Sequence, residues 1–185
     1  QIRLKLVKKI IEMSPKKLNR VLLLTTGTEA TECALKISRI RGKKIDNKKI
    51  KIVSFFGAMH GKTLGALMVG GKTKEKGWIG KQDPNIHHIS FPFPEICDWG
   101  KTKNHKCNNE CFLKSINQLT KKINPSSIAA RFIESYHGWG ALFYPKSYIK
   151  ELEKWAKKND ILIVFDEIQS GFGRTGKLFA FEHYN

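Results

Sequence analysis

Residues 161–177 read ILIVFDEIQSGFGRTGK, an apolar run that leads through two acids into a glycine-rich loop. A continuous apolar run of this length is typical of a strand buried in a parallel sheet, and Asp166 stands at its end. The glycines of the loop are spaced as G-x-G-x-x-G, the dinucleotide pattern, and residues 171–177 also match most of a phosphate-binding P-loop. The stretch therefore predicts a buried strand, and it raises the question of what its loop binds.

Neither nucleotide motif is complete in this loop. Both motifs require a strand that runs directly into the first glycine and a helix that opens at the last one. Here residues 166–170 separate the strand from the first glycine, and the residues after Gly176 lack a helical apolar stripe. A P-loop also needs Ser or Thr after its lysine to hold magnesium, and Leu178 occupies that position. We therefore interpret the loop as a flexible glycine turn.

The residues around the loop point to different chemistry. A carboxylate at the end of an apolar strand, such as Asp166, is partly desolvated and needs a cationic or proton-donating partner, although it can also simply cap the next turn. Gln169 can both donate and accept a hydrogen bond. Gly27 and Thr28 offer backbone N–H groups and a hydroxyl at a predicted helix start, which together make an anion site. An anion site and a buried carboxylate indicate a phosphorylated cofactor with a cationic ring.

The rest of the chain predicts strands that alternate with helices. We expect strands at 21–26, 50–56, 86–91, 126–134 and 161–165. We expect helices at 2–13, 27–42, 113–123 and 148–160, with a helical or irregular segment at 63–71. This order predicts a three-layer α/β fold with a mainly parallel sheet, covered on both faces, whose chemistry collects at the carboxyl ends of the strands.

Two of the expected helices, 27–42 and 148–160, carry clear end signals. The helix at 27–42 has acids in its first turn, bases in its last turn and Gly42 as its stop. Its expected apolar face comprises Ala30, Cys33, Ala34 and Ile37. The helix at 148–160 is expected to have Ser147 as its N-cap and an ion pair between Glu153 and Lys157, four residues apart.

The chain is strongly basic, with 34 Lys and Arg residues against 16 Asp and Glu residues and a formal net charge of +18. This charge leaves a basic nucleic-acid-binding domain as an alternative. The lysines are spread along the whole chain, and no zinc-finger or RNA-binding signature occurs, so a lysine-rich surface is the simpler interpretation. No apolar run approaches the length of a membrane span, and the first residues do not resemble a signal peptide.

The cysteines do not form a recognisable framework. Four cysteines are too few and too scattered for a disulfide scaffold, so we expect free thiols in a reducing cytoplasm. Three of them lie near a histidine but lack a C-x-x-C pair, and we therefore expect no metal site. The residues of this group are Cys97, His105, Cys107 and Cys111.

Three stretches together resemble the class III (ornithine/GABA-type) aminotransferases: TTGTEATECALKISR (25–39), FFGAMHGKTLGALMVGG (55–71) and ILIVFDEIQSGFGRTGKLFAFEHY (161–184). The resemblance begins near Val21 and continues to the last residue in the same order, and the D-E-I-Q-x-G-F-G-R-T-G-K block is its most specific part. It implies the large domain of a fold type I enzyme that uses pyridoxal 5'-phosphate. Such an enzyme transfers an amino group between an amine or amino acid and a keto acid or aldehyde.

The resemblance also implies roles for single residues. Gly27 and Thr28 would bind the cofactor phosphate. Asp166 would pair with the protonated pyridine nitrogen, so that the ring can act as an electron sink. Ile168 would pack against one face of the ring, and Gln169 would hydrogen-bond near the phenolic oxygen. The glycine loop would then be a turn that leaves the site.

Three departures from the family pattern accompany the resemblance. The family stacks an aromatic residue on the cofactor where this chain has Met59, followed by His60, and either of these two could take that role. Glu134, by contrast, follows the family pattern: it matches the first Glu of the family's E-P-x-x-G-E segment and would support the network around the cofactor. Trp139 stands where members that accept terminal amines have a second Glu, which argues against a simple ornithine or GABA enzyme. The Schiff-base lysine is not found in this chain.

Further expectations rest on the resemblance. Residues 1–185 would be a partial cofactor-binding large domain, without the N-terminal segment, the Schiff-base lysine region and the small C-terminal domain, and inactive alone. The intact parent would be a cytoplasmic homodimer that acts on small amines and keto acids, with no nucleic-acid or membrane partner. A decarboxylase, mutase or epimerase of the same family is the alternative activity.

Overall fold

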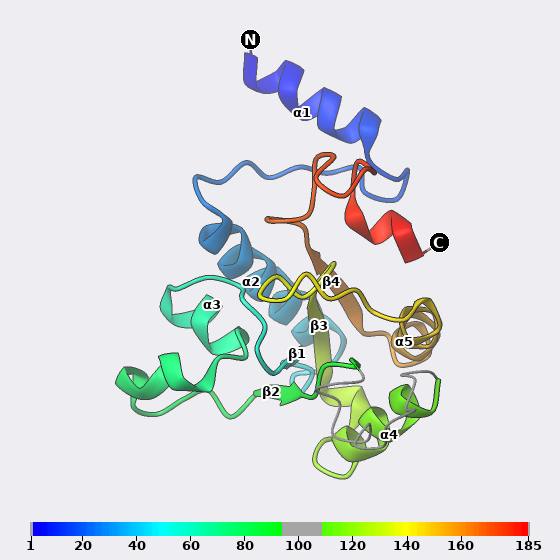
Figure 1. Ribbon diagram of the computed structural model, residues 1–185. Helices are drawn as coiled ribbons and strands as arrows, with labels where there is room; N and C mark the ends of the chain where they lie inside the picture. The colour runs from blue at the N-terminus through cyan, green and yellow to red at the C-terminus, as the bar shows by residue number, and fades with distance from the viewer. Residues whose placement is uncertain (1, 94–108, 185) are drawn as a thin grey trace.

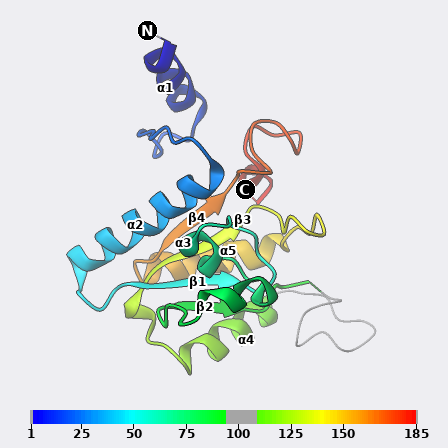
Figure 2. The same ribbon diagram turned by 90° about the vertical axis from the view of Figure 1, so that its left-hand side faces the viewer.

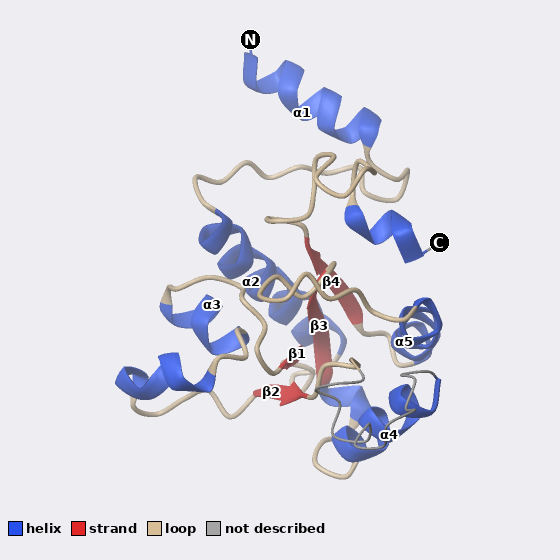
Figure 3. Cartoon of the chain, in the orientation of Figure 1, coloured by secondary structure: helices blue, strands red, loops and turns tan. Residues whose placement is uncertain are grey.

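The computed structural model describes residues 2–93 and 109–184, and four parallel strands form one sheet in this part of the chain. The order across the sheet is β2-β1-β3-β4, and each neighbouring pair is parallel. Figure 3 shows these strands in red between the helices. Their bounds are Lys51–Phe55 (β1), Ile86–Ile89 (β2), Ile128–Glu134 (β3) and Leu162–Asp166 (β4).

Helices cover both faces of the sheet and complete the predicted three layers. Helices α2 and α3 lie on one face, and α4 and α5 lie on the other (Figure 1). Helix α1 projects away from the sheet in both views and buries none of its residues (Figures 1 and 2). The α-helices are Ile2–Met13 (α1), Gly27–Ile45 (α2), Leu64–Val69 (α3), Asn109–Thr120 (α4) and Lys146–Lys158 (α5), and the 3-10 helices are Thr73–Ile79 (η1), Pro125–Ser127 (η2) and Ala180–Tyr184 (η3).

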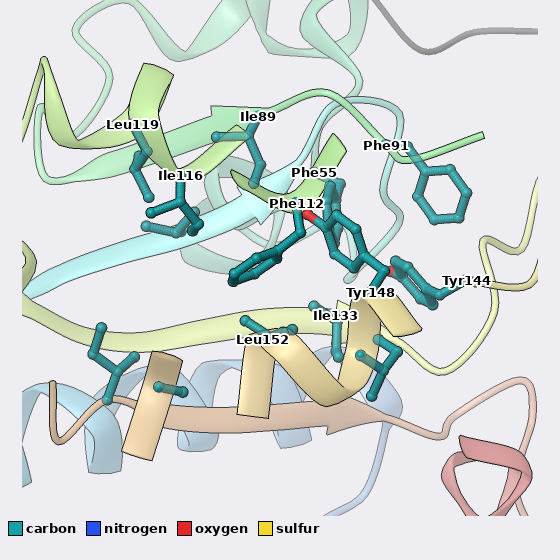
Figure 4. Close-up of a cluster of buried hydrophobic side chains, with 14 of the residues drawn as sticks. Phe55, Ile89, Phe91, Phe112, Ile116, Leu119, Ile133, Tyr144, Tyr148 and Leu152 are labelled. Atoms are coloured by element: carbon teal, nitrogen blue, oxygen red, sulfur yellow. The ribbon is translucent and has the colours of Figure 1, made fainter. Parts of the chain in front are cut away.

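Each face of the sheet has its own hydrophobic core. The larger core packs Phe55 and Ile133 of the sheet against α4 and α5, where the rings of Phe112 and Tyr148 meet edge to face at 5.3 Å (Figure 4). The smaller core, beneath α2 and α3, contains Leu35, Ile52, Val69, Ala129, Ala130 and Phe132. Side chains of a strand point alternately to the two faces, so β3 is buried along its whole length, as an interior strand of a two-sided parallel sheet must be.

The strand register brings two acids together at the carboxyl edge of the sheet. Glu134, the last residue of β3, is the direct partner of Asp166, the last residue of β4. Strand β1 ends on the same edge and feeds the loop that contains Met59 and His60. The parallel topology therefore gathers residues separated by about a hundred positions, as expected for an α/β sheet.

The strand predicted at 21–26 is wrong. These residues form an irregular segment that leads into α2, and none of the four described strands pairs with them. Leu22, Leu23 and Leu24 are 64%, 43% and 44% exposed. Apolar composition alone cannot make a strand, because the backbone groups of a strand also need a hydrogen-bonding neighbour.

The end predicted for α2 is also wrong, and its predicted buried face is right only in part, because Ala34 packs against the smaller core whereas Ala30 is exposed. The helix continues past Gly42 to Ile45, and its buried residues are Thr31, Leu35, Ser38 and Gly42. Ile37, expected on that face, is 53% exposed. Gly42 lies against the backbone oxygen of Lys49, where a Cβ atom would clash, so this glycine serves close packing and does not end the helix. Small residues face the sheet because they allow this close approach.

The cap predicted for α5 is wrong by a small shift. The helix begins at Lys146, its N-cap position is Pro145, and no side chain supplies a cap hydrogen bond there. Ser147 therefore lies inside the first turn. The ion pair found on this helix joins Lys154 Nζ to Glu151 Oε1 at 2.8 Å, rather than the predicted Glu153 and Lys157.

Candidate cofactor site

A cavity of about 540 Å3 opens at the carboxyl edge of the sheet. Four segments far apart in sequence supply its walls: the start of α2, the loop after β1, the loop after β3 and the residues after β4. All eight residues expected in the site line this one cavity: Gly27, Thr28, Met59, His60, Glu134, Asp166, Ile168 and Gln169. The structure therefore brings the whole predicted set together, although the role of each residue remains a prediction.

Asp166 faces a buried histidine at the floor of the cavity. Its Oδ2 atom lies 2.7 Å from His60 Nδ1, and its Oδ1 atom accepts the backbone N–H of Ile168 at 3.1 Å. The His60 side chain is fully buried, and that of Asp166 is 9% exposed. A carboxylate accepts hydrogen bonds, so this contact places the imidazole proton on Nδ1. His60 Nε2 is buried and has no hydrogen-bond partner among the described residues.

Glu134 joins two loops of the cavity. Its Oε2 atom accepts the backbone N–H of Met59 at 3.2 Å, and its Oε1 atom accepts that of Gly138 at 3.3 Å. Burial raises the pKa of Glu134 from its usual value, against the opposing effect of nearby His60. The carboxyl group therefore fixes the loops after β1 and β3 relative to each other at the edge of the sheet.

The start of α2 has the geometry of an anion site. Thr26 is the N-cap, and it forms a capping box in which its hydroxyl accepts the N–H of Glu29 at 3.2 Å and the Glu29 carboxylate accepts the N–H of Thr26 at 2.9 Å. The first amides of a helix lack carbonyl acceptors inside the helix, so those of Gly27 and Thr28 are available to a ligand. The Thr28 hydroxyl accepts the N–H of Lys62 at 3.2 Å, which connects this anion site, called the cradle below, to the loop after β1.

Small residues keep the cavity open. A Cβ atom on Gly61 would clash with Thr28 Oγ1 and lie 2.9 Å from Ala66, and Gly61 has a positive φ of 129°. A Cβ atom on Gly138 would clash with Gln169 and lie 2.9 Å from Glu134 Oε1. Glycine at these positions lets the backbone approach the cradle and the acids without filling the space between them.

The remaining predicted residues differ in how exposed they are. Ile168 is 59% exposed, and its side chain lies over Gly27, at 2.9 Å from a Cβ atom placed there. Gln169 is also exposed, and Met59 is partly buried. Of the two residues that could stack on a ring, Met59 therefore has free surface, whereas the His60 side chain is buried and contacts Asp166.

The glycine loop 171–176 turns away from the cavity and opens no α-helix. The Gly173 N–H donates to Leu178 O at 3.1 Å, and the chain then enters the 3-10 helix η3. Glu167 fixes the base of this loop, because its carboxylate accepts hydrogen bonds from the hydroxyls of Ser135 and Ser170. It also accepts the backbone N–H groups of Ala180 and Phe181 at 2.8 and 2.9 Å. Asp166 thus lines the cavity, whereas its neighbour Glu167 accepts the hydrogen bonds that hold the loop.

Sequence reasoning missed several residues of the cavity. The additional lining residues are Thr26, Gly61, Lys72, Tyr136, Gly138 and Ser170, and Trp139 also lines it. Lys72 was hidden in a stretch rich in glycine and lysine, where no periodicity marks one lysine among many. Gly71 forms backbone hydrogen bonds with the loop after β1, and these bonds bring the next residue, Lys72, to the cavity. In the sequence, the Gly70-Gly71 pair is the signal of that close approach.

The other sequence expectations concern metals, cysteines and membranes. Cys97, His105 and Cys107 lie outside the described residues, and Cys111 is buried. Among the described residues, no group of three or more His, Cys, Asp or Glu side chains could hold a metal ion. No helix in residues 2–93 and 109–184 is long and apolar enough to cross a membrane.

Comparison with known proteins gives one consistent result. The family model described as Aminotransferase class-III matches residues 2–185. An adenosylmethionine-8-amino-7-oxononanoate aminotransferase from Staphylococcus aureus is 35% identical over 190 residues, which cover 97% of this chain and 40% of the relative. An alanine/serine racemase from Pyrococcus horikoshii is 32% identical over 189 residues, which cover 98% of this chain and 39% of the relative.

The solved structures agree with the sequence relatives. A thermostable (S)-enantioselective omega-transaminase from Thermomicrobium roseum superposes with a TM-score of 0.87 at 27% identity, over 98% of this chain and 40% of that one. The likeness confirms the predicted fold class, a partial fold type I large domain. The chain spans about 40% of the length of the curated relatives that it matches.

Proposed function

Because this chain belongs to the class III aminotransferase family, whose members depend on pyridoxal 5'-phosphate, we propose that the intact protein is a transaminase with that cofactor. It would transfer an amino group between an amine or amino acid and a keto acid or aldehyde. The observation that carries the proposal is the shared cavity, in which the Asp166–His60 pair and the anion cradle at Gly27 and Thr28 face the same space. The activity is assigned to the intact protein, of which these residues form part.

The residues of the cavity fit this cofactor. Its phosphate matches the free amides and hydroxyl of Gly27 and Thr28 at a helix N-terminus. Its cationic ring nitrogen matches a buried carboxylate, and the absence of Cβ atoms at Gly61 and Gly138 leaves room between the two ends. Ile168 and Met59 offer apolar surface for the two faces of a ring, and Gln169 offers an amide for its phenolic oxygen.

When bound, the cofactor supplies an electron sink for the charge that develops at the substrate α-carbon. Asp166 supports this role because a carboxylate with little access to water keeps a proton on the ring nitrogen. His60 donates a hydrogen bond to Asp166 Oδ2 and thereby orients the carboxylate. Glu134 holds the loop of Met59 in place, so that the site stays ordered around the ring.

One test uses the colour of the intact protein. We expect the protein as purified to be yellow and to lose that absorbance permanently on treatment with sodium borohydride, because the reagent reduces the C=N bond between cofactor and lysine to a secondary amine. In a separate sample stripped of its cofactor without reduction, added pyridoxal 5'-phosphate should restore the colour. We also expect it to convert an amine donor and a keto acid into the exchanged pair. A colourless protein that cannot be reconstituted would refute the proposal.

A racemase or epimerase is the second candidate, because two racemases stand among the relatives, from Pyrococcus horikoshii and Thermococcus litoralis. A single experiment separates the two activities. The protein is incubated with one enantiomer of an amino acid, with and without a keto acid acceptor. Formation of the opposite enantiomer without an acceptor supports a racemase, and consumption that requires the acceptor supports a transaminase.

The assembly and location of the protein complete the proposal. We propose a homodimer, on the basis of the family, and a cytoplasmic location, because the four cysteines of the sequence are too few and too scattered for a disulfide scaffold. Light scattering of the intact protein at micromolar concentration should give twice the mass of one chain, and a monomer at that concentration would contradict the assembly.

A further inference from the structure

Two residues that the cofactor roles leave unused, Lys72 and Trp139, lie on the wall of the cavity. The same turn of the chain connects them. The backbone N–H of Gly57 donates to Gly71 O at 3.1 Å, next to Lys72, and a Cβ atom on Gly57 would lie 3.1 Å from Trp139 Nε1. Lys72 and Trp139 therefore flank the loop after β1 and form what we call the cavity rim.

Lys72 gives this rim a positive charge that its neighbours balance only in part. Its Nζ atom lies 3.9 Å from Glu75 Oε1, whereas Glu75 Oε2 lies 3.3 Å from Lys62 Nζ. One carboxylate thus stands between two ammonium groups, which leaves a surplus of positive charge. Among the described residues that line the cavity, Lys72 is the sole lysine or arginine.

The acids and histidines of the cavity do not cancel the charge of Lys72. Asp166 is paired with His60 at the floor, and Glu134 is occupied with two backbone amides and has a raised pKa because of its burial. Burial lowers the pKa of His137, so its ring is neutral near pH 7 and adds no charge. An entering molecule therefore meets a cation at the rim whose one described carboxylate neighbour, Glu75, is shared with Lys62.

Trp139 adds apolar surface to the same rim. Its side chain is 56% exposed and meets the His137 ring edge to face, with centroids 5.5 Å apart. An indole held in this way offers a broad apolar face and no carboxylate that could pair with a cationic substrate. The rim thus combines one cation with one aromatic surface.

We propose that Lys72 and Trp139 select the substrate of the proposed transaminase, so this inference rests on that function. Lys72 attracts an amine substrate that also carries a carboxylate, and Trp139 covers an uncharged, apolar side chain. A substrate with a second ammonium group is repelled by Lys72, and the nearby Glu75 carboxylate is already paired with Lys62 and Lys72. The favoured class is therefore an amino acid with an apolar side chain, rather than a diamine or a basic amino acid.

Three matched amines test the selection on the intact, cofactor-loaded protein. Norleucine has both features, lysine adds a terminal ammonium group to it, and pentylamine lacks its carboxylate. We expect kcat/KM to be highest for norleucine. In Lys72→Gln, we expect the norleucine value to fall about fivefold, through KM, with little change for pentylamine, since a partly exposed ion pair contributes about 1 kcal/mol. In Lys72→Glu, the kcat/KM for lysine, divided by that for norleucine, should be higher than in Lys72→Gln.

A control variant and a binding measurement support the assay. Lys74→Gln removes one positive charge from the 3-10 helix η1, of which Lys72 is the N-cap, at an exposed position that does not line the cavity. It should therefore leave all three values within about twofold. Hexanoate, which has a carboxylate but no amine, should inhibit competitively. Its inhibition constant should rise about fivefold in Lys72→Gln, and it should rise with salt in the wild type. Trp139→Ala should lower kcat/KM for norleucine more than for alanine.

The outcomes separate this inference from the function on which it rests. An equal loss for norleucine and pentylamine in Lys72→Gln, together with weaker cofactor retention, would assign Lys72 to the cofactor phosphate and overturn the inference. Unchanged discrimination among the three amines in both Lys72 variants would overturn it as well. In either case the wild type would still bind the cofactor and transaminate, whereas failure of the proposed function would remove both.

Discussion

Two glycine-bearing turns of this molecule resemble phosphate-binding loops, but the helices behind them differ. Gly27 opens a helix of 19 residues, and the capping box of Thr26 and Glu29 fixes its first turn at the cavity. The loop 171–176 has the better nucleotide spacing, yet it folds back on itself and ends in a 3-10 helix of five residues. We refer to these two regions as the cradle and the distal loop.

The difference shows that glycine spacing alone does not make an anion site. The cradle gains its donors from the free amides at the start of a long helix and from the Thr28 hydroxyl, which is tied to the loop after β1. The distal loop has no long helix behind it, and its base is tied to Glu167, an acid. Chemistry in this stretch therefore belongs to Asp166, before the glycines.

The largest expected effect is the difference in kcat between a substitution at Asp166 and one in the distal loop that follows it. In the intact protein, Asp166→Ala should lower kcat about a thousandfold or more even with the cofactor bound, because it removes a preorganised charge from the site. Arg174→Gln, in the distal loop, should leave kcat within about twofold, as expected for an exposed side chain. Steady-state kinetics at saturating cofactor measure both variants. Near-normal turnover by Asp166→Ala would remove the ring-nitrogen role.

A matched pair of glycine substitutions compares the cradle and the distal loop directly. Gly61 and Gly173 both have positive φ, at 129° and 89°, so alanine strains the backbone at either position. A Cβ atom on Gly61 would clash with Thr28 Oγ1, whereas one on Gly173 would meet no atom within 4 Å. We expect Gly61→Ala to weaken pyridoxal 5'-phosphate binding at least about fivefold, since a clash typically costs about 1–3 kcal/mol.

Gly173→Ala is the control, because it carries backbone strain without a contact at the cradle. Cofactor affinity, measured by spectroscopic titration of the cofactor-free protein, should stay close to the wild-type value. Equal weakening by both substitutions would mean that backbone strain, rather than the shape of the cradle, determines affinity.

The smallest effect concerns pH and the buried acid beside the cradle. Burial raises the folded-state pKa of Glu134, so the native protein holds this proton more tightly than the unfolded chain does. The contribution of this group to stability is therefore greatest at acid pH and falls as pH rises through the ordinary carboxyl pKa towards the raised one. Glu134→Gln should remove this part of the decline, measured as the free energy of unfolding in denaturant from about pH 4 to 7. An unchanged slope would contradict the raised pKa.

Much of the fold was predictable because β1, β3 and β4 are mainly apolar and the strands alternate with helices, a pattern that favours a parallel sheet. The segment 21–26 shows where this reasoning ends, because strand formation depends on a hydrogen-bonding neighbour that local composition does not reveal. The face of α2 was missed for a related reason. Thr31, Ser38 and Gly42 are buried because they are small enough for close packing, and a search for apolar side chains passes over them.

The site was predictable where a residue stands at a strand end or a helix start, as Asp166, Glu134 and Gly27 do. The partnership of His60 with Asp166 was not, because 106 positions separate them and only the strand order brings them together. The role of Glu167 was hidden for another reason. Adjacent acids at a strand end look alike in sequence, yet they point to opposite sides of the chain.

The protonation state of the cofactor ring tests the central claim most directly. Pyridoxal 5'-phosphate labelled with 15N at its ring nitrogen is bound to the intact protein, and the 15N chemical shift is followed across neutral pH. The account predicts a protonated nitrogen in the wild type, and a neutral nitrogen in Asp166→Ala at the same pH. A neutral ring nitrogen in the wild type, or the same protonated signal in both proteins, would contradict the assignment of Asp166.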